Sequence, residues 1–517
     1  MANKTLFASL VARLRPKTDA RNAEGGAAYA RTPEQALAQL AATGCLNTTF
    51  YAAAETQLES VLGLASGVGA EFVAQTAVYC RERGRMKDMP ALLLAVLSRR
   101  DPALMDRVFD RVIDSPRMLR TFVQIVRSGA TGRTSLGSAP KRCVRRWIDA
   151  RGDDALFAAS IGEAPSLADV IRMVRPKPAT AARAALYGYL IGRTVDRAQL
   201  PANVAAFEAF KADRAADVPD VPFQMLTALD LDRRAWIEIA RRGSWQMTRM
   251  NLNTFARHGV FTDEAVTAAI AARLRDAAAI ARARVLPYQL LATFRSLSAD
   301  VPNMVRGAVE DALEQALANV PVLDGQVYVC PDVSGSMRSP ITGQRGSATT
   351  SMRCVDVAAL VAAAILRRNP SAEVLPFEQD VVDVRVSARD SVMTNAERLA
   401  AIGGGGTAVS APLAQLNACN AKGSLVIVVS DNESWVDASV ADDTATLAEW
   451  TRFKRRNPAA RLVLIDLQPS QTTQARDRED VLNVGGFSDS VFELIADFAA
   501  GRMTGSHWVD RIAAVAV

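Results

Sequence analysis

The spacing of hydrophobic positions divides the chain into two regions with different secondary structure. In residues 1–320, apolar positions recur three or four apart in the segments 32–44, 90–100, 101–115 and 262–285, as in amphipathic helices. Thr32, Pro33 and Gly44 supply start and stop signals for the first of these helices. Strand signals are sparse, so stacked helical hairpins of the HEAT type are predicted, although no strict repeat period is found.

From about residue 320 onward, short β-branched runs alternate with amphipathic segments. The runs at 326–330, 372–377, 424–430 and 461–467 predict buried parallel strands, and the segments 352–369, 411–420 and 442–457 predict covering helices. This alternation is typical of a doubly wound α/β sheet. We therefore predict an all-α helical-repeat domain over residues 1–322 and a doubly wound α/β domain over residues 323–517.

Charge is distributed unevenly between these regions. Residues 1–320 contain 43 Lys and Arg against 32 Asp and Glu, a net charge of +11, whereas residues 321–517 contain 18 against 23, a net charge of −5. A polyanionic partner such as nucleic acid is therefore expected to bind the first region. The alternative is that the excess arginine forms an ordinary solvated surface.

Cysteine, histidine and hydropathy exclude several classes of protein. The six cysteines lie far apart with no CxxC pair, which indicates buried, reduced thiols and a cytoplasmic protein rather than a disulfide framework or a zinc site. The chain has two histidines, too few for us to expect a His-based zinc site or the catalytic relay of a hydrolase. No apolar run approaches the roughly 18 residues of a membrane helix. Arg13 and Arg15 interrupt the N-terminal apolar stretch, so we read it as part of a folded domain rather than a signal peptide.

The sequence PDVSGSM, residues 331–337, follows the first predicted strand and carries acid and hydroxyl groups two residues apart. Ligands of doubly wound sheets bind in the loops beyond the carboxyl ends of the strands, where the loops 403–409 and 428–434 also lie. Asp332, Ser334, Ser336, Thr407 and Asp431 therefore form an all-oxygen set that suits Mg²⁺ or Mn²⁺. A partner or a neighbouring loop could supply a further acidic group. In the alternative interpretation these side chains only cap helices.

Basic residues are concentrated in residues 127–151, which hold seven Lys and Arg and the single acid Asp149. On a helix, the basic side chains cover one face while Cys143, Val144, Trp147 and Ile148 cover the other. A Gly/Ser/Thr loop precedes this helix, and free backbone N–H groups beside positive charge bind phosphates. Two further basic segments lie at 169–180 and 245–259. The candidate nucleic-acid contacts are Arg127, Arg133, Lys141, Arg142, Arg145, Arg146, Arg172, Arg175, Lys177, Arg249, Asn251, Arg257 and His258.

Two sets of motifs resemble known families. The D-x-S-x-S motif at 332–336, the Gly-rich loop with Thr407 and the strand-end Asp431 resemble the metal-ion-dependent adhesion site of von Willebrand factor A domains. The segments 132–147, 166–178, 245–261 and 286–296 resemble the TROVE module of the Ro ribonucleoprotein family. Together these resemblances cover nearly the whole chain.

The Ro resemblance implies a monomeric ring of HEAT-like repeats closed by the A domain, in a non-enzymatic bacterial RNA quality-control protein. In such proteins the single-stranded end of a misfolded RNA threads the ring, a small structured Y RNA docks outside, and polynucleotide phosphorylase can act as a partner exoribonuclease. The chain departs from eukaryotic members, which have a basic helix where residues 153–165 carry no Lys or Arg and tend to have His where Arg175 stands. Pro331 before the first metal acid is also unusual.

Two other functions fit the residues. An A-domain scaffold or adhesion protein would bind an acidic protein ligand at the metal site. A Mg²⁺-dependent ribonuclease is the third possibility, but Asp332 and Asp431 are few acids for a two-metal nuclease.

Overall fold

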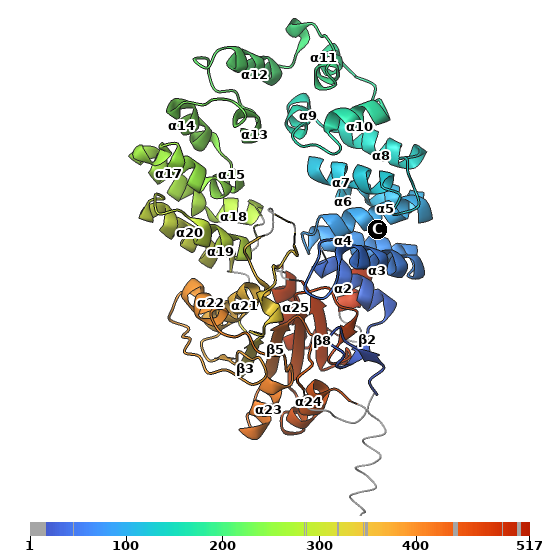
Figure 1. Ribbon diagram of the computed structural model, residues 1–517, viewed down its shortest axis with the longest axis vertical. Coiled ribbons are helices and arrows are strands. Elements are labelled where there is room, and N and C mark those ends of the chain that lie inside the picture. Colours follow the sequence, from blue (N-terminus) through green and yellow to red (C-terminus); the bar gives the residue numbers. More distant parts are fainter. Residues whose placement is uncertain are drawn as a thin grey trace, which may run out of the picture. The chain divides into compact units, whose positions relative to one another are not determined.

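The computed structural model describes residues 17–517 apart from 45, 284, 286, 318–319, 345, 347–349, 438–442, 487, 489 and 504–507. The chain separates into two compact units (Figure 1). One contains residues 1–89 and 319–516 and is called the A-domain unit below; the other contains residues 90–318 and is called the helical unit. This division differs from the predicted boundary at 322/323, because the first 89 residues group with the C-terminal segment.

The centre of the A-domain unit is a five-stranded parallel sheet. Its strands are β3 (Val327–Pro331), β4 (Glu373–Val374), β5 (Leu425–Ser430), β6 (Arg461–Asp466) and β8 (Val481–Gly485), in the spatial order β4-β3-β5-β6-β8. The order reverses between β3 and β5, which makes this pair the topological switch point of a doubly wound sheet. The carboxyl ends of β3 and β5 therefore diverge into loops that leave a crevice between them.

Helices cover both faces of this sheet, which explains its continuous apolar strands. Tyr328, Val426 and Leu462 point to the face covered by α23 (Ala411–Ala418) and α24 (Ala445–Arg456), where Trp450 and Phe453 are fully buried. The opposite face packs against α21 (Cys354–Arg368), which also contacts α22 (Val392–Ala400). The remaining helices of this segment are α25 (Ser490–Ala499) and α26 (Trp508–Ala513).

Pro331 is accommodated because the sheet is irregular on one side of β3. The backbone N–H of Asp332 donates to Val429 on β5, so the neighbouring Pro331 nitrogen faces the other side. There β4 is only two residues long and ends at Val374, before the position of Pro331. The proline therefore removes no hydrogen bond from the β3–β5 pairing.

The N-terminal segment belongs structurally to the A-domain unit. β1 (Ala20–Arg21) and β2 (Ala27–Ala30) form a small antiparallel sheet with β7 (Thr472–Thr473). Arg31 forms a buried ion pair with Asp466 at the end of β6, and the Tyr29 hydroxyl donates to Asp443 at 2.6 Å. Three helices follow, namely α2 (Pro33–Thr43), α3 (Ala54–Gly67) and α4 (Ala70–Glu82). Of these, α2 packs against β8 and α4 packs against α26.

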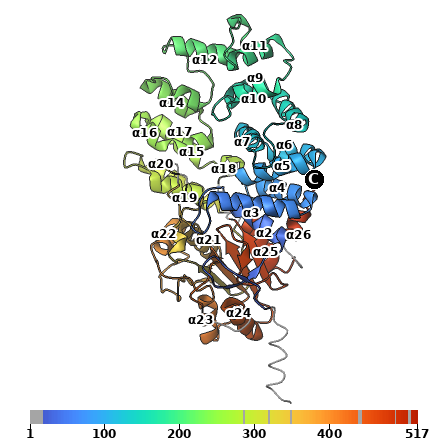
Figure 2. The same ribbon diagram turned by 45° about the vertical axis from the view of Figure 1, so that its right-hand side comes forward.

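The helical unit consists of short helices in which each packs against helices nearby in sequence (Figures 1 and 2). After α5 (Asp88–Arg100), which begins at the unit boundary, its α-helices are α6 (Pro102–Val112), α7 (Pro116–Arg127), α8 (Ser138–Asp149), α9 (Asp153–Ala159), α10 (Leu167–Val174), α11 (Ala181–Leu190), α12 (Ala202–Ala212), α13 (Phe223–Leu226), α14 (Arg233–Arg242), α15 (Trp245–Met250), α16 (Leu252–Arg257), α17 (Glu264–Leu274), α18 (Ala277–Ala283), α19 (Pro287–Ser296) and α20 (Asn303–Ala316). Pairs such as α6 with α8, α8 with α10 and α17 with α20 are in contact. Such local packing is typical of helical repeats.

The predicted fold class, helical repeats plus a doubly wound α/β domain, is confirmed. The predicted strands at 326–330, 424–430 and 461–467 match β3, β5 and β6 to within one residue. The predicted strand at 372–377 is longer than the two-residue β4, and β8 was not predicted. Within the described residues, no helix is long and apolar enough to cross a membrane.

Cysteine environments agree with the expectation of buried thiols at four positions. Cys80, Cys143, Cys330 and Cys354 are buried, and burial raises the pKa of the Cys80 thiol to about 12, which keeps it neutral. Cys419 is exposed, contrary to the expectation, because it lies at the end of α23 beyond the last buried turn. Cys45 lies outside the described residues.

Candidate functional site

The sheet places four of the five predicted metal ligands at the switch point, and the Gly-rich loop carries the fifth, Thr407. Asp332, Ser334 and Ser336 leave β3, Thr407 ends the Gly-rich loop, and Asp431 follows β5. The Asp332 carboxylate accepts hydrogen bonds from the Ser334 backbone N–H at 2.8 Å and from the Ser430 hydroxyl at 2.5 Å. Ser430 directly precedes Asp431, so this bond joins the two strand ends.

The Gly-rich loop is attached to the same cluster. The Gly335 N–H donates to Gly405 at 2.9 Å, and the hydroxyls of Ser334 and Ser336 lie 3.3 Å apart. Gly403 adopts φ +95°, and a side chain there would meet the Val333 carbonyl oxygen at 1.8 Å. Glycine is therefore required for this loop to approach the acid–serine turn closely.

The two acids share a buried, electronegative environment. Asp332 is 0% and Asp431 1% exposed. Burial, followed by the nearby charge of Asp431, raises the pKa of Asp332 to about 7. Burial also raises the pKa of Asp431. The groups that oppose the rise in the pKa of Asp332 are the hydrogen-bond donors Ser430 and Ser334 rather than a basic side chain.

These features fit a small divalent cation. The donors are carboxylates and hydroxyls, the hard oxygen ligands that Mg²⁺ and Mn²⁺ prefer, and two unneutralised carboxylates lie where a cation would compensate them. The cluster holds only two acids, in agreement with the finding that no group of three or more His, Cys, Asp or Glu within the described residues could hold a metal. Two carboxylates and three hydroxyls are also the donor set of the metal-ion-dependent adhesion site that the sequence resembles.

Two side chains at this cluster were missed by the sequence analysis. Ser430 holds Asp332 from the neighbouring strand, and its position one residue before Asp431 was the signal that could have found it. Tyr51 lies against Asp431 at 3.4 Å but comes from a segment 380 residues away in sequence, which no local pattern could have revealed.

The basic face of α8 forms a network of ion pairs with α6. Arg142 donates to Asp106 at 2.7 Å, and Arg146 pairs with both Asp106 and Asp110. The hydrogen bond from Arg142 lowers the pKa of Asp106 to about 2. Part of the predicted positive surface is therefore neutralised within the unit. Trp147 and Cys143, on the other face of α8, are fully buried, as their spacing predicted.

Other predicted RNA contacts also have partners within the unit. Arg133 donates to the Ser98 carbonyl at 2.7 Å, and Arg145 donates to the Val174 carbonyl. Arg172 pairs with Asp169 at 3.1 Å. Arg249 is 8% exposed and donates to Gln289 and Thr293 inside the unit, so it is placed as a structural residue. This burial argues against an RNA contact at Arg249.

The remaining predicted contacts of the basic segment 245–259 are Asn251, Arg257 and His258. Asn251 donates to the Met247 carbonyl at 2.8 Å, and Arg257 donates to Thr254 at 3.2 Å. His258 is exposed at its edge and stacks on Trp236, with ring centroids 4.1 Å apart.

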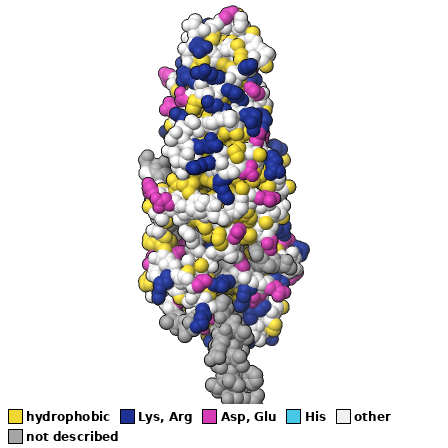
Figure 3. Space-filling model, turned by 90° about the vertical axis from the view of Figure 1, so that its right-hand side faces the viewer, with side chains coloured by type: hydrophobic (Ala, Val, Ile, Leu, Met, Phe, Trp, Pro, Cys, Tyr) yellow, Lys and Arg dark blue, Asp and Glu magenta, His cyan; other side chains and the backbone are white. Residues whose placement is uncertain are grey.

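Four predicted cations have no side-chain partner within the described residues. They are Arg127 at the end of α7, Lys141 near the start of α8, and Arg175 and Lys177 just after α10. On the face shown in Figure 3, Lys and Arg side chains are spread widely and are interspersed with Asp and Glu. On this face the basic side chains are therefore dispersed rather than gathered in one patch.

A cavity of about 720 Å³ lies in the helical unit between α9 and the segment α12–α15. Its walls include Phe157, Phe223, Met247 and Met250, with Asn251 among its amide side chains. Met250 is 68% exposed. Asn251 was among the residues predicted from the sequence, whereas the two aromatic residues, Phe157 on α9 and Phe223 on α13, were not.

Comparison with known proteins defines the class of each part. Residues 326–499 match the family described as the Ro60 vWA domain. The chain is 26% identical to the RNA-binding protein RO60 of Deinococcus radiodurans over 95% of its own length and 98% of that protein. It also resembles the crystal structure of the Deinococcus radiodurans RO (RSR) protein, with a TM-score of 0.59 and 20% identity over 91% of this chain and all of the other.

The chain thus combines a von Willebrand A domain with a helical-repeat unit. The A domain is of the Ro60 type, and the predicted resemblance of the whole chain to the Ro family is confirmed by these matches.

Proposed function

We propose that the chain is a Ro-like RNA-binding protein. The observation that carries this proposal is the similarity, over nearly the full length of both chains, to a bacterial protein named as RNA-binding. The excess of 43 Lys and Arg over 32 Asp and Glu in residues 1–320 supports it, because phosphate neutralisation dominates RNA affinity.

Phosphate contacts are assigned first to the four cations without a side-chain partner in the described part of the chain, Arg127, Lys141, Arg175 and Lys177. Such a side chain gives up no internal ion pair when it binds RNA. Arg133, Arg142, Arg145, Arg146, Arg172 and Arg257 come second, because each must exchange or share an existing partner. Asn251 lines the cavity, and the exposed His258 stacks on Trp236; both suit contacts to unpaired nucleotides.

Single-stranded RNA suits the cavity of the helical unit. Aromatic walls allow bases to stack without regard to sequence, and side-chain amides can donate to and accept from base edges. We propose that the chain holds the single-stranded ends of misfolded RNA together with a small structured, Y-like RNA, for quality control or decay in the cytoplasm. The chain is proposed to act without catalysis and to deliver RNA to an exoribonuclease such as polynucleotide phosphorylase.

The oxygen cluster is proposed to hold Mg²⁺, with Mn²⁺ as a possible substitute. The ligands are Asp332, Ser334, Ser336, Thr407 and Asp431. A bound cation would supply positive charge between two buried acids, and the chain's own residues orient those acids through Ser430 and the Ser334 N–H.

The test is RNA affinity as a function of salt. A labelled single-stranded RNA is titrated with the full chain at 50 and 200 mM salt, and affinity is expected to fall by about 300-fold or more if six or more phosphates are contacted. A change of less than about threefold would contradict the proposal. The scaffold alternative, in which the chain binds an acidic protein ligand through the metal, predicts no such salt-dependent RNA binding. Intact RNA after incubation with Mg²⁺ excludes the ribonuclease alternative.

A further inference from the structure

The N-terminal segment reaches the metal-ligand cluster through one side chain, Tyr51. Its hydroxyl donates to Asp431 Oδ2 over a long distance of 3.4 Å and also hydrogen-bonds with Ser336. Two of the five proposed metal ligands are thus in contact with one tyrosine.

Several backbone contacts fix the position of the loop that carries Tyr51. The Asn47 side chain donates to the Thr342 carbonyl at 2.8 Å, and the Gln344 N–H donates to the Thr48 carbonyl at 2.7 Å. The Thr49 N–H donates to Ala52 at 2.9 Å and closes the turn around Tyr51. The loop that carries Tyr51 is therefore attached to the A domain by hydrogen bonds that do not involve the tyrosine side chain.

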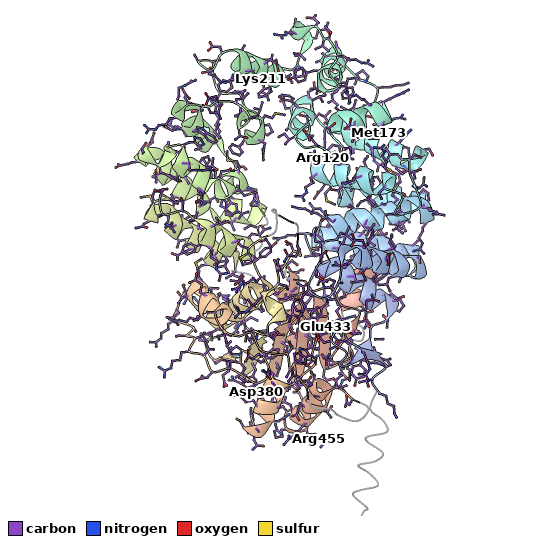
Figure 4. All side chains as sticks on the ribbon, in the orientation of Figure 1. Arg120, Met173, Lys211, Asp380, Glu433 and Arg455 are labelled. Atoms are coloured by element: carbon purple, nitrogen blue, oxygen red, sulfur yellow. The ribbon has the colours of Figure 1, made fainter. Side chains whose placement is uncertain are left out.

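The loop that follows Asp431 is held by the same N-terminal segment. The Ala23 N–H donates to the Glu433 carboxylate at 2.7 Å, and the Asn22 side chain donates to the Ser434 carbonyl at 2.6 Å. Glu433, labelled in Figure 4, lies within the A-domain unit. Asp431 is thus bounded by N-terminal residues on two sides, Tyr51 on its carboxylate and Asn22 and Ala23 on its loop.

The ligand set is closed rather than open. The five side chains are between 0% and 8% exposed. An adhesion-type site that recruits an acidic side chain from a partner must leave a coordination position that the partner can reach. Here the side toward Ser336 and Asp431 is occupied by Tyr51 from the same chain.

We propose that Tyr51 is a positioning residue that completes the metal site from within the chain. Its hydroxyl orients the Asp431 carboxylate and its ring covers the site. The cation then fastens the N-terminal segment to the A domain and is not presented to an acidic partner. The metal would thus join the N-terminal segment to the A domain and would not serve as a binding site for a partner protein.

The first test measures Mn²⁺ affinity of the full chain by the loss of the free-ion EPR signal. Removing an outer-shell hydrogen bond to a metal ligand typically weakens binding about 10–100-fold, and Tyr51→Phe is expected to fall near the lower end of this range. Tyr29→Phe is the matched control, since Tyr29 also donates from the N-terminal segment to a buried carboxylate, Asp443, but is not in contact with the ligands. It is expected to bind Mn²⁺ as the unmodified chain does, and melting temperatures in EDTA verify that both variants are folded.

The outcomes separate this inference from the metal site on which it rests. If the unmodified chain binds no Mn²⁺, both the site and the role of Tyr51 are overturned. If the unmodified chain binds Mn²⁺ and Tyr51→Phe binds it equally or more tightly, only the role of Tyr51 is overturned. Weaker binding by Tyr51→Phe alone supports the inference.

The second test asks whether a carboxylate from outside can reach the cation. Water proton relaxation reports the exchangeable waters on bound Mn²⁺, and millimolar acetate serves as the carboxylate probe. Acetate is expected to leave the relaxation of the unmodified chain unchanged and to lower that of Tyr51→Ala, in which the cover is removed. If acetate lowers the relaxation of both proteins equally, the site is open and Tyr51 is not its cover.

Discussion

The oxygen cluster and the basic helix α8 were both predicted from short motifs, yet the structure treats them differently. The cluster gathers residues from positions 332 to 431 into one buried site, in which neither acid has a positive partner among the described residues. Helix α8 carries its cations side by side in the sequence, but Arg142 and Arg146 are paired with acids of α6. The fold thus brings the metal-ligand residues, which are far apart in sequence, into one site. It neutralises part of the charge of α8, whose cations are neighbours in sequence.

The difference follows from what fixes each arrangement. Parallel strands end at the same edge of a sheet, so residues just after β3 and β5 converge wherever the alternation of strands and helices is correct. A basic helix face has no such constraint, because its charge can be balanced by any neighbouring helix. The number of Lys and Arg in a segment therefore overstates its unpaired positive charge. By contrast, the ends of predicted parallel strands indicate which acids, here Asp332 and Asp431, come together.

The largest expected effect comes from removing one acid of the cluster. Asp332→Asn should weaken Mn²⁺ binding at least about 100-fold, since it removes a ligand charge and so exceeds the usual effect of outer-shell changes. Asn keeps the size of the side chain and ends the repulsion with Asp431, so the melting temperature in EDTA should not fall. RNA affinity should remain within about twofold if the two regions act separately.

Asp437→Asn is the control for this variant. Asp437 is a carboxylate of the same segment that accepts hydrogen bonds from Ser410 and Ser434 at 2.5 Å and is not a proposed ligand. Its Mn²⁺ affinity should match that of the unmodified chain. A loss of RNA affinity in Asp332→Asn but not in Asp437→Asn would show that the metal site takes part in RNA binding. The metal site and the RNA-binding residues of the helical unit would then not act independently.

The second prediction compares free with paired cations in the helical unit. The combined change of Arg127, Lys141, Arg175 and Lys177 to Gln should lower the slope of log affinity against log salt by about one for each phosphate that is no longer neutralised. The combined change of Arg142, Arg146 and Arg172 to Gln should have a smaller effect for each residue, because their acids already neutralise part of their charge. Titrations with one RNA at several salt concentrations measure both slopes.

Equal effects for each residue in the two sets would show that RNA displaces the internal partners. The ranking into free and paired cations would then be wrong, although RNA binding itself would stand.

Much of the A domain could be predicted because its signals are local. Apolar β-branched runs identified three of the five strands, and helical spacing identified α21, α23 and α24 but not α22. Four of the proposed ligands directly follow β3 or β5, and Thr407 lies in the loop before α23. The strand β8 was not found because its sequence, VLNVG, is short and contains Asn and Gly. The two-residue strand β4 was overestimated because the apolar run continues past Val374 into a loop.

Contacts between distant segments could not be predicted. The pairing of β2 with β7 and the contact of Tyr51 with Asp431 join positions about 380 to 440 residues apart, and neither leaves a periodic signal. Arg249 was predicted as an RNA contact because an exposed and a buried arginine look alike in sequence. Its polar partners, Gln289 and Thr293, lie on another helix, α19.

The third prediction releases paired cations without adding new ones. Asp106→Asn removes the carboxylate shared by Arg142 and Arg146, while Arg146 keeps Asp110. One more net positive charge at α8 should raise RNA affinity about two- to threefold at low salt, with the gain disappearing as salt screens it. The same RNA titration as above measures it. Unchanged or weaker binding at low salt would place the RNA away from this face of α8.

The smallest effect concerns the pH dependence of the same ion pairs. The Arg142 hydrogen bond holds the pKa of Asp106 at about 2, below the value of roughly 3.9 expected for an unfolded chain. Its contribution to stability is therefore fully present above about pH 4 and is lost as the pH falls toward 2. The contribution is less than about 1 kcal/mol, because Arg142 and Arg146 are 61% and 42% exposed. Amide hydrogen exchange in α8 should thus be about two- to fivefold faster in Asp106→Asn than in the unmodified chain at pH 5, and nearly equal at pH 2. A difference of the same size at both pH values would mean that the asparagine disturbs packing between α6 and α8, and that the ion pairs do not account for the stability of this helix pair.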